Sequence, residues 1–227
     1  MKVTFILAEA ALEPIPSSLR KDARIIKSCK KLGKKPDKCL LDKSLHYWAM
    51  DRLVDKEKRG RPDIAYHVML DVTSSPLYKS GLLDFFVHTY NDYIIKVGNN
   101  VRPPRTYVRF EGLILDLFEK KIIKDINGNV LLELKRGKVK DILSEIGTSS
   151  AVGFDVDGEL VTYEHAAKQI ISGQKVFIVG GFPTGDFSIE TSSLFAKKFS
   201  LAREMLEADT VTCRLIYEIE KVLLLAK

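Results

Sequence analysis

The sequence has few of the residues that build disulfide or metal frameworks. Only three cysteines occur in 227 residues, Cys29, Cys39 and Cys213, and no CxxC pair or Cys/His spacing typical of zinc sites is present. We therefore expect free thiols and no metal. GxSxG, GxGxxG and the phosphate loop with its Lys-Ser/Thr are also missing, which excludes the common serine hydrolase and nucleotide-binding motifs.

Long apolar runs are missing as well. The opening run 3–8 is far shorter than the roughly 20 residues of a membrane span, and it has no signal-peptide cleavage pattern. We expect a cytoplasmic protein with no membrane partner. With 45% hydrophobic residues, the chain is long enough for one sizeable domain, and its net charge of +6 favours an anionic partner such as nucleic acid.

Hydrophobic periodicity predicts an α/β protein. The predicted strands are 2–8, 64–72, 82–88, 151–155 and 175–179, with an extended segment at 93–97 and hairpins at 122–134 and around Asp157-Gly158. The predicted helices are 17–32, a helix from about Ser44 to Leu53 capped by Ser44, one starting after Thr106, 139–146, 163–172 and 209–226. The alternation after residue 151 predicts a parallel sheet, whereas the middle of the chain, around 90–140, looks inserted.

A glycine-rich turn, GGFPTG, follows the predicted strand 175–179 directly. Three glycines and a proline fix a sharp backbone path that lets main-chain groups approach a ligand, at the end of a strand where α/β sheets usually bind one. The alternative interpretation is a tight turn without a ligand.

Five arginines fall in two proline-containing loops: Arg59, Arg61, Arg102, Arg105 and Arg109. The last three crowd the start of the helix after Thr106. Guanidinium groups suit phosphates, and a helix N-terminus favours anions, so the pattern favours RNA or phosphate binding. The alternative is surface ion pairing with Asp63 and Glu111. Asp63 stands two residues after Arg61, where it could orient that guanidinium.

Three motifs, in this order and spacing, resemble a known family. RGRPD (59–63), RPPRTYVRFEGL (102–113) and VGGFPTGDF (179–187) are similar to the ribosome-biogenesis pseudouridine N1-methyltransferases of the SPOUT (α/β-knot) superfamily, in their archaeal form. The similarity extends over essentially the whole chain. It implies a single SPOUT domain over 1–227 with an insertion around 90–140, a C-terminal trefoil knot, a homodimer, and contact with small-subunit rRNA and ribosomal assembly proteins.

The resemblance also implies the reaction and its residues. S-adenosylmethionine would donate a methyl group to N1 of a pseudouridine in small-subunit rRNA. The family's cofactor positions correspond here to Phe154, Gly180, Gly185, Leu201, Ala202, Arg203, Glu204, Met205 and Leu206. Its RNA-binding positions correspond to Arg61, Arg102, Arg105 and Arg109, with Arg59 as an addition, and its catalytic pair to Arg61 and Asp63. Residues 203–209 carry more charge than the small residues expected there.

Two other functions fit the same motifs. The first is an rRNA-binding assembly factor without catalysis, and the second is a SPOUT methyltransferase that acts on another nucleotide. In the methyltransferase reading, the sulfonium of the donor is already a good leaving group, so transfer needs positioning and charge stabilisation rather than a metal or a covalent nucleophile.

Overall fold

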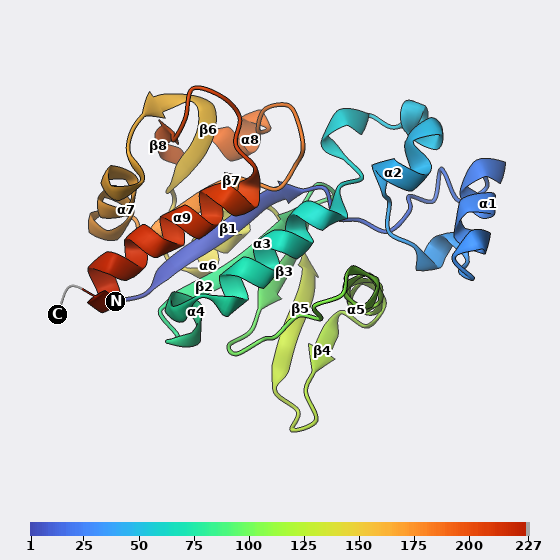
Figure 1. Ribbon diagram of the computed structural model, residues 1–227, viewed down its shortest axis with the longest axis horizontal. Coiled ribbons are helices and arrows are strands. Elements are labelled where there is room, and N and C mark those ends of the chain that lie inside the picture. The colour runs from blue at the N-terminus through green and yellow to red at the C-terminus, as the bar shows by residue number, and fades with distance from the viewer. Residues whose placement is uncertain (226–227) are drawn as a thin grey trace.

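An eight-stranded sheet runs through the middle of the protein, with β1 (Val3–Ala10) near its centre (Figure 1). The computed structural model describes residues 1–225. The strand order is β4-β5-β3-β2-β1-β7-β6-β8. The bounds are β2 Leu83–Thr89, β3 Tyr93–Val97, β4 Ile122–Lys124, β5 Val130–Arg136, β6 Ala151–Leu160, β7 Val176–Gly180 and β8 Phe195–Ser200.

The part of the sheet formed by β2, β1, β7, β6 and β8 is parallel, which confirms the prediction from the strand and helix alternation. β1 pairs in parallel with β2 and β7, and β6 pairs in parallel with β7 and β8. On the other side, β3, β5 and β4 continue the sheet with antiparallel pairing. This antiparallel part lies within the range 90–140, whose identity as an insertion into a single domain stays a prediction.

Side chains of β1 alternate between two buried layers, as expected for a central strand covered on both faces. Val3, Phe5 and Leu7 face one layer, and Ile6 and Ala8 face the other. The first layer is formed by α3 (Pro62–Ser74), α4 (Pro76–Lys79), α5 (Tyr107–Lys120), α7 (Tyr163–Ser172) and α9 (Ala208–Glu220). The second contains α6 (Val139–Glu145) together with residues next to the short α8 (Ile189–Ser192).

Residues 15–53 build a small core of their own at one end of the sheet (Figure 1). It includes buried residues of α1 (Ala23–Lys31) and of the turns after α2 (Lys43–His46). Both helices are shorter than predicted. α1 begins only after Asp22, whose side chain accepts a hydrogen bond from the backbone N–H of Arg24, and α2 is capped by Asp42 rather than Ser44. A 3-10 helix, Tyr47–Arg52, replaces the rest of the second predicted helix.

The prediction of a buried strand at 64–72 is wrong, because this run is most of helix α3. Pro62 stands in the first turn, where its fixed φ and missing N–H fit a helix start, and Asp63 is the acidic residue of that turn. Eight of the thirteen residues are buried, since the helix packs against the sheet, α5 and α9. A helix covered on several sides has no clear 3.6-residue stripe, so the sequence could not separate it from a buried strand.

The hairpin predicted at Asp157-Gly158 is also wrong. β6 continues through this dipeptide to Leu160, with irregular register against β8. Gly158 is needed for close approach rather than for a turn, since a Cβ there would lie 2.5 Å from the carbonyl carbon of Phe199. The sequence missed β8 itself.

The other predicted elements are confirmed, with small shifts at their ends. The hairpin 122–134 is β4 and β5, and the helix after Thr106 is α5. The last predicted helix, 209–226, is α9 followed by a π-helical turn, Lys221–Leu225, and Ala226 lies outside the described residues. Within residues 1–225, the helices are too short or too polar to cross a membrane.

Candidate active site

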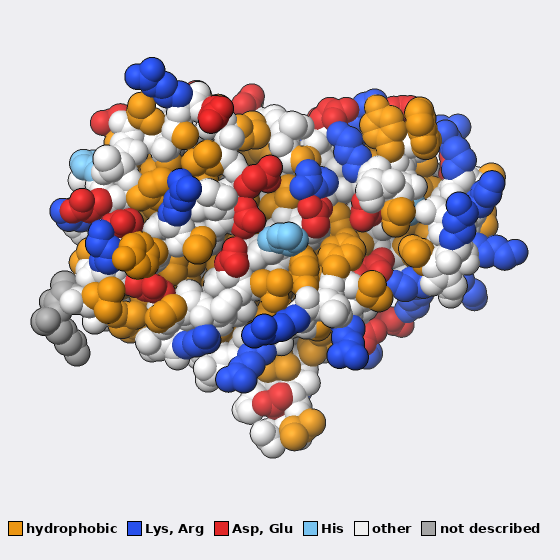
Figure 2. All heavy atoms as spheres, in the orientation of Figure 1, with side chains coloured by type: hydrophobic (Ala, Val, Ile, Leu, Met, Phe, Trp, Pro, Cys, Tyr) orange, Lys and Arg blue, Asp and Glu red, His pale blue; other side chains and the backbone are white. Residues whose placement is uncertain are grey.

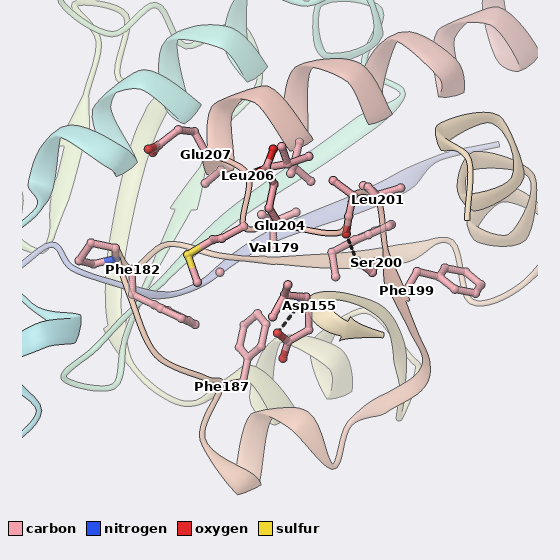
Figure 3. Close-up of a pocket in the computed structure, with 18 of the residues that line it drawn as sticks. Asp155, Val179, Phe182, Phe187, Phe199, Ser200, Leu201, Glu204, Leu206 and Glu207 are labelled. Carbon is pink, nitrogen blue, oxygen red and sulfur yellow. Dashed lines mark hydrogen bonds between the residues drawn. The ribbon is translucent and has the colours of Figure 1, made fainter. Parts of the chain in front are cut away.

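A cavity of about 230 Å³ lies between the segments that follow β7 and β8 (Figure 3). Ligands of α/β sheets usually bind beyond the carboxyl ends of the strands, and these two segments occupy that place. Of the predicted cofactor residues, all except Arg203 line the cavity: Phe154, Gly180, Gly185, Leu201, Ala202, Glu204, Met205 and Leu206. Residues that are 20 or more positions apart in the sequence thus form one site.

The GGFPTG turn is held against the end of β1. The N–H of Gly181 donates to Ala8 O at 2.8 Å, and Gly181 O accepts from the N–H of Ala11 at 2.9 Å. A Cβ at Gly181 would lie 2.8 Å from Ala10 Cα, and Gly185 has a φ of +94°, so both positions require glycine. The turn is therefore built from close backbone contact rather than from side-chain packing.

Glu9, at the end of β1, connects the turn to the arginine-containing loop. Its carboxylate accepts hydrogen bonds from the Lys58 ammonium at 2.6 Å and from the N–H of Ser188 at 2.9 Å. Lys58 also donates to Asp186 O at 2.6 Å. Burial alone would raise the pKa of Glu9, but hydrogen bonds from Lys58, Ser188 and Thr191 together hold this pKa below its usual value. Sequence reasoning missed Glu9 because it ends an apolar strand.

Arg61 and Asp63 form an ion pair beside the cavity. Nε and Nη2 of Arg61 lie 2.9 and 2.8 Å from Oδ1 and Oδ2 of Asp63, so the carboxylate holds the guanidinium with both oxygens. Ile64, the next residue of α3, lines the cavity, as does Glu207. The hydrogen bonds that Arg61 donates to Asp63, with a smaller contribution from the charge of Glu207, raise the pKa of Arg61. The predicted pairing of these two side chains is confirmed.

Arg102, Arg105 and Arg109 are exposed around the start of α5, as predicted. Among residues 1–225 they take part in no ion pair. Glu111 instead pairs with Lys34. The hydroxyl of Tyr66 on α3 donates to Arg105 O, which ties this arginine loop to the helix that carries Asp63. Figure 2 shows basic side chains gathered below the centre of this face and at its α1 end.

Arg59 is placed differently from the other four arginines. Its side chain is only 8% exposed, and its Nε and Nη2 each lie 2.7 Å from the carboxylate of Glu13, which is 2% exposed. Its guanidinium also lies 4.7 Å from the ring centroid of Tyr90. The assignment of Arg59 to RNA binding is therefore corrected. This arginine forms an interior ion pair with Glu13 that anchors the loop.

The site contains further residues that the sequence did not suggest. Phe182 and Phe187 line the cavity with their rings edge to face at 5.2 Å, and Asp155, Ser200 and Glu207 complete its walls. Phe182 belongs to the glycine turn and Phe187 follows it by two residues, so this position was the available signal. Asp155 and Ser200 lie at strand positions whose pairing the sequence did not reveal.

Comparison with known proteins agrees with this geometry. Residues 5–220 match the model of the EMG1/NEP1 methyltransferase family. The chain is 37% identical to "Ribosomal RNA small subunit methyltransferase Nep1" of Staphylothermus marinus, over 94% of this chain and 93% of that protein. It is also 37% identical to the Nep1 protein of Pyrococcus furiosus, over 96% of each chain.

A solved structure is similar over nearly the full length. The crystal structure of Archaeoglobus fulgidus Nep1 bound to S-adenosylhomocysteine superposes with a TM-score of 0.86 and 35% identity, covering 98% of this chain and 99% of that one. The predicted SPOUT fold is thereby confirmed, whereas its C-terminal knot stays a prediction. From the sheet order, the cavity and these full-length similarities, we conclude that the chain belongs to the EMG1/NEP1 methyltransferase family.

Proposed function

We propose that this protein is an S-adenosylmethionine-dependent methyltransferase that acts on N1 of a pseudouridine in small-subunit rRNA and serves small-subunit biogenesis. One observation carries the proposal: helix α3, whose Ile64 lines the cavity between the segments after β7 and β8, carries the Arg61–Asp63 pair at its start. Relatives named as small-subunit rRNA methyltransferases support the substrate class. A related structure that holds S-adenosylhomocysteine, the demethylated form of the donor, supports the cofactor.

The cavity fits a donor of this kind. Its walls combine backbone from the glycine turn and from 201–206 with the rings of Phe154 and Phe187, a lining suited to an adenine base and a thioether chain. When bound, S-adenosylmethionine supplies an electrophilic methyl group on a sulfonium. The chain's own residues have to hold it, exclude water and orient the acceptor base.

Arg61 is assigned to the acceptor. Pseudouridine carries an N1–H that uridine lacks, and methylation at N1 releases this proton to solvent. A guanidinium beside the base would stabilise the anion that develops there. Asp63 accepts hydrogen bonds from both Nε and Nη2 of Arg61 and so fixes the orientation of the guanidinium. Asp63 is thus a positioning residue in this scheme.

RNA binding is assigned to the exposed arginines Arg102, Arg105 and Arg109. Their guanidinium groups stand at the N-terminus of α5, where the helix dipole also favours phosphate. We further propose that the protein is a cytoplasmic homodimer that works alongside ribosomal assembly proteins. Sedimentation of the purified chain would test the dimer.

The experiment that tests the function uses two RNA stem-loops that differ only in having pseudouridine or uridine at one position. Each is incubated with the protein and S-adenosylmethionine, and the nucleosides are analysed by mass spectrometry. We expect N1-methylpseudouridine from the first RNA and no methylated nucleoside from the second. Methylation of another nucleotide would contradict the proposal that pseudouridine is the substrate. RNA binding without methylation would identify an assembly factor.

A further inference from the structure

The ionisable side chains that line the donor cavity all have the same sign. Among residues 1–225, the lining contains three carboxylates, Asp155, Glu204 and Glu207, and no lysine, arginine or histidine. An excess of acidic groups around a cavity in a basic protein, with a net charge of +6, is unlike the arginine-rich surface next to it. The cavity is therefore suited to a ligand with positive charge.

Asp155 is the most enclosed of the three. It is partly buried and follows Phe154 in β6. Its carboxylate accepts a hydrogen bond from the N–H of Val156 at 2.7 Å and, among residues 1–225, has no ion-pair partner. The nearby Lys198 is paired with Asp157 at 2.6 Å. Burial, with smaller contributions from Asp157 and Asp186, raises the pKa of Asp155, and the hydrogen bond from Val156 and the charge of Lys198 offset this only in part.

Glu204 and Glu207 stand across the cavity from Asp155, on the segment that leads into α9 (Figure 3). Both are exposed. Solvent therefore screens their charge more than it screens that of Asp155. Glu207 also lies close enough to Arg61 to raise the pKa of the Arg61 guanidinium. The negative charge of Glu207 therefore acts on that guanidinium as well as on the cavity.

Methyl transfer changes the charge of the ligand in this cavity. S-adenosylmethionine carries a sulfonium, an ammonium and a carboxylate, which gives a net charge of +1. S-adenosylhomocysteine has a neutral thioether in place of the sulfonium, so its net charge is zero. A negative potential inside the cavity acts on this difference, because every other group of the two ligands is the same.

We propose that the cavity carboxylates, Asp155 above all, make the protein prefer the cationic donor to its uncharged product, and so favour release of the product after each transfer. This inference rests on the proposed function. It assigns a role in discrimination between donor and product to Asp155, to Glu207, and to Glu204 within the predicted cofactor segment. This role depends on charge rather than on a hydrogen bond. A neutral amide of the same shape at Asp155 should therefore lower the affinity for the cationic donor but not for its uncharged product.

The test is a calorimetric titration of the full-length protein with three ligands: S-adenosylmethionine, S-adenosylhomocysteine and sinefungin. Sinefungin replaces the sulfonium by a carbon that bears an amine, so it keeps the positive charge but cannot donate a methyl group. For Asp155→Asn we expect the affinity for both cationic ligands to fall by about fivefold, with the affinity for S-adenosylhomocysteine changed by less than about twofold. The preference should also weaken as salt is raised.

Two further variants make the result decisive. Glu164→Gln removes a carboxylate of α7 that pairs with Lys168 and lies outside the cavity lining, so it should change no affinity. The double variant Glu204→Gln, Glu207→Gln alters only exposed positions. It should also lose affinity for the two cationic ligands selectively, but by a smaller factor. This variant keeps the proposal testable if Asp155→Asn does not fold. Equal weakening of all three ligands, or no change in any of them, would overturn it. A wild-type protein that binds none of the three would instead contradict the proposed function.

Discussion

The two oxygens of the Asp63 carboxylate hold the Arg61 guanidinium at 2.9 and 2.8 Å, one residue before the cavity wall begins at Ile64. Both side chains are about two-fifths exposed, at 39% and 41%, so the pair adds little to folding stability. Its effect is on orientation. The carboxylate holds the guanidinium in one orientation although both side chains are partly exposed.

Replacing either member of this pair should therefore affect turnover more than stability. For Arg61→Ala we expect kcat to fall by about 100-fold, the scale on which loss of one preorganised donor acts. Asp63→Asn should reduce kcat by a smaller factor, because the arginine remains but is no longer held by charge. S-adenosylmethionine affinity, measured by calorimetry, should stay within about twofold of wild type in both variants. Wild-type turnover in both would remove the pair from the mechanism.

The exposed arginines should behave as phosphate contacts. Arg102→Gln, Arg105→Gln and Arg109→Gln should each weaken RNA binding at low salt. Each should also reduce the slope of log affinity against log salt concentration by about 0.7, the value for one phosphate contact on a single strand. Fluorescence anisotropy over a salt series measures both effects. A variant with lower affinity and an unchanged slope would show that its arginine does not contact phosphate.

Arg59 offers the opposite expectation, although it lies two residues from Arg61. It forms a buried pair with Glu13, and removing one partner of such a pair leaves an uncompensated interior charge. Arg59→Ala should thus lower the free energy of unfolding by about 3–5 kcal/mol, measured by urea denaturation. The salt dependence of RNA binding by the folded variant should equal that of wild type. A reduced slope would return Arg59 to the RNA-binding surface.

Glu9 should make the site sensitive to acid. Burial raises its pKa, but hydrogen bonds from Lys58, Ser188 and Thr191 outweigh burial, so its pKa in the folded protein lies below the reference value of 4.5. The stabilisation is complete above about pH 4.5 and is lost as the pH falls through the lower, folded-state pKa. Thermal unfolding at pH 7 and at decreasing acid pH should show a steeper loss for wild type than for Glu9→Gln. Parallel curves would mean that the contacts of the Glu9 carboxylate add nothing to the stability of the folded protein.

The sequence predicted the local parts of this site better than its assembly. The glycine turn was recognisable because close backbone approach at Gly181 and a positive φ at Gly185 demand glycine. The Arg61–Asp63 pair was recognisable because its members are two positions apart. By contrast, the hydrogen bond from Ser188 to Glu9 joins residues 179 positions apart, and no local pattern encodes it.

The errors have a common physical origin. The run 64–72 predicts a strand because helix α3 is covered by the sheet and by two helices, so its apolar residues go round the helix without a 3.6-residue stripe. The sequence places Arg59 among the RNA-binding arginines because nothing local reveals its partner, Glu13, which is 46 positions away. The strand β8 escaped notice because FAKKFS at the edge of the sheet mixes apolar and charged residues without a clear alternation. In each case the deciding contact is made by tertiary packing.

The central claim is that residues 180–186 and 201–206 enclose one methyl-donor molecule next to Arg61. A crystal structure of this protein with S-adenosylhomocysteine tests it most directly. We predict that the ligand lies between these two segments, with its sulfur on the side of the cavity that faces Arg61 and Ile64. A ligand bound elsewhere, or one whose sulfur faces away from Arg61, would contradict the account.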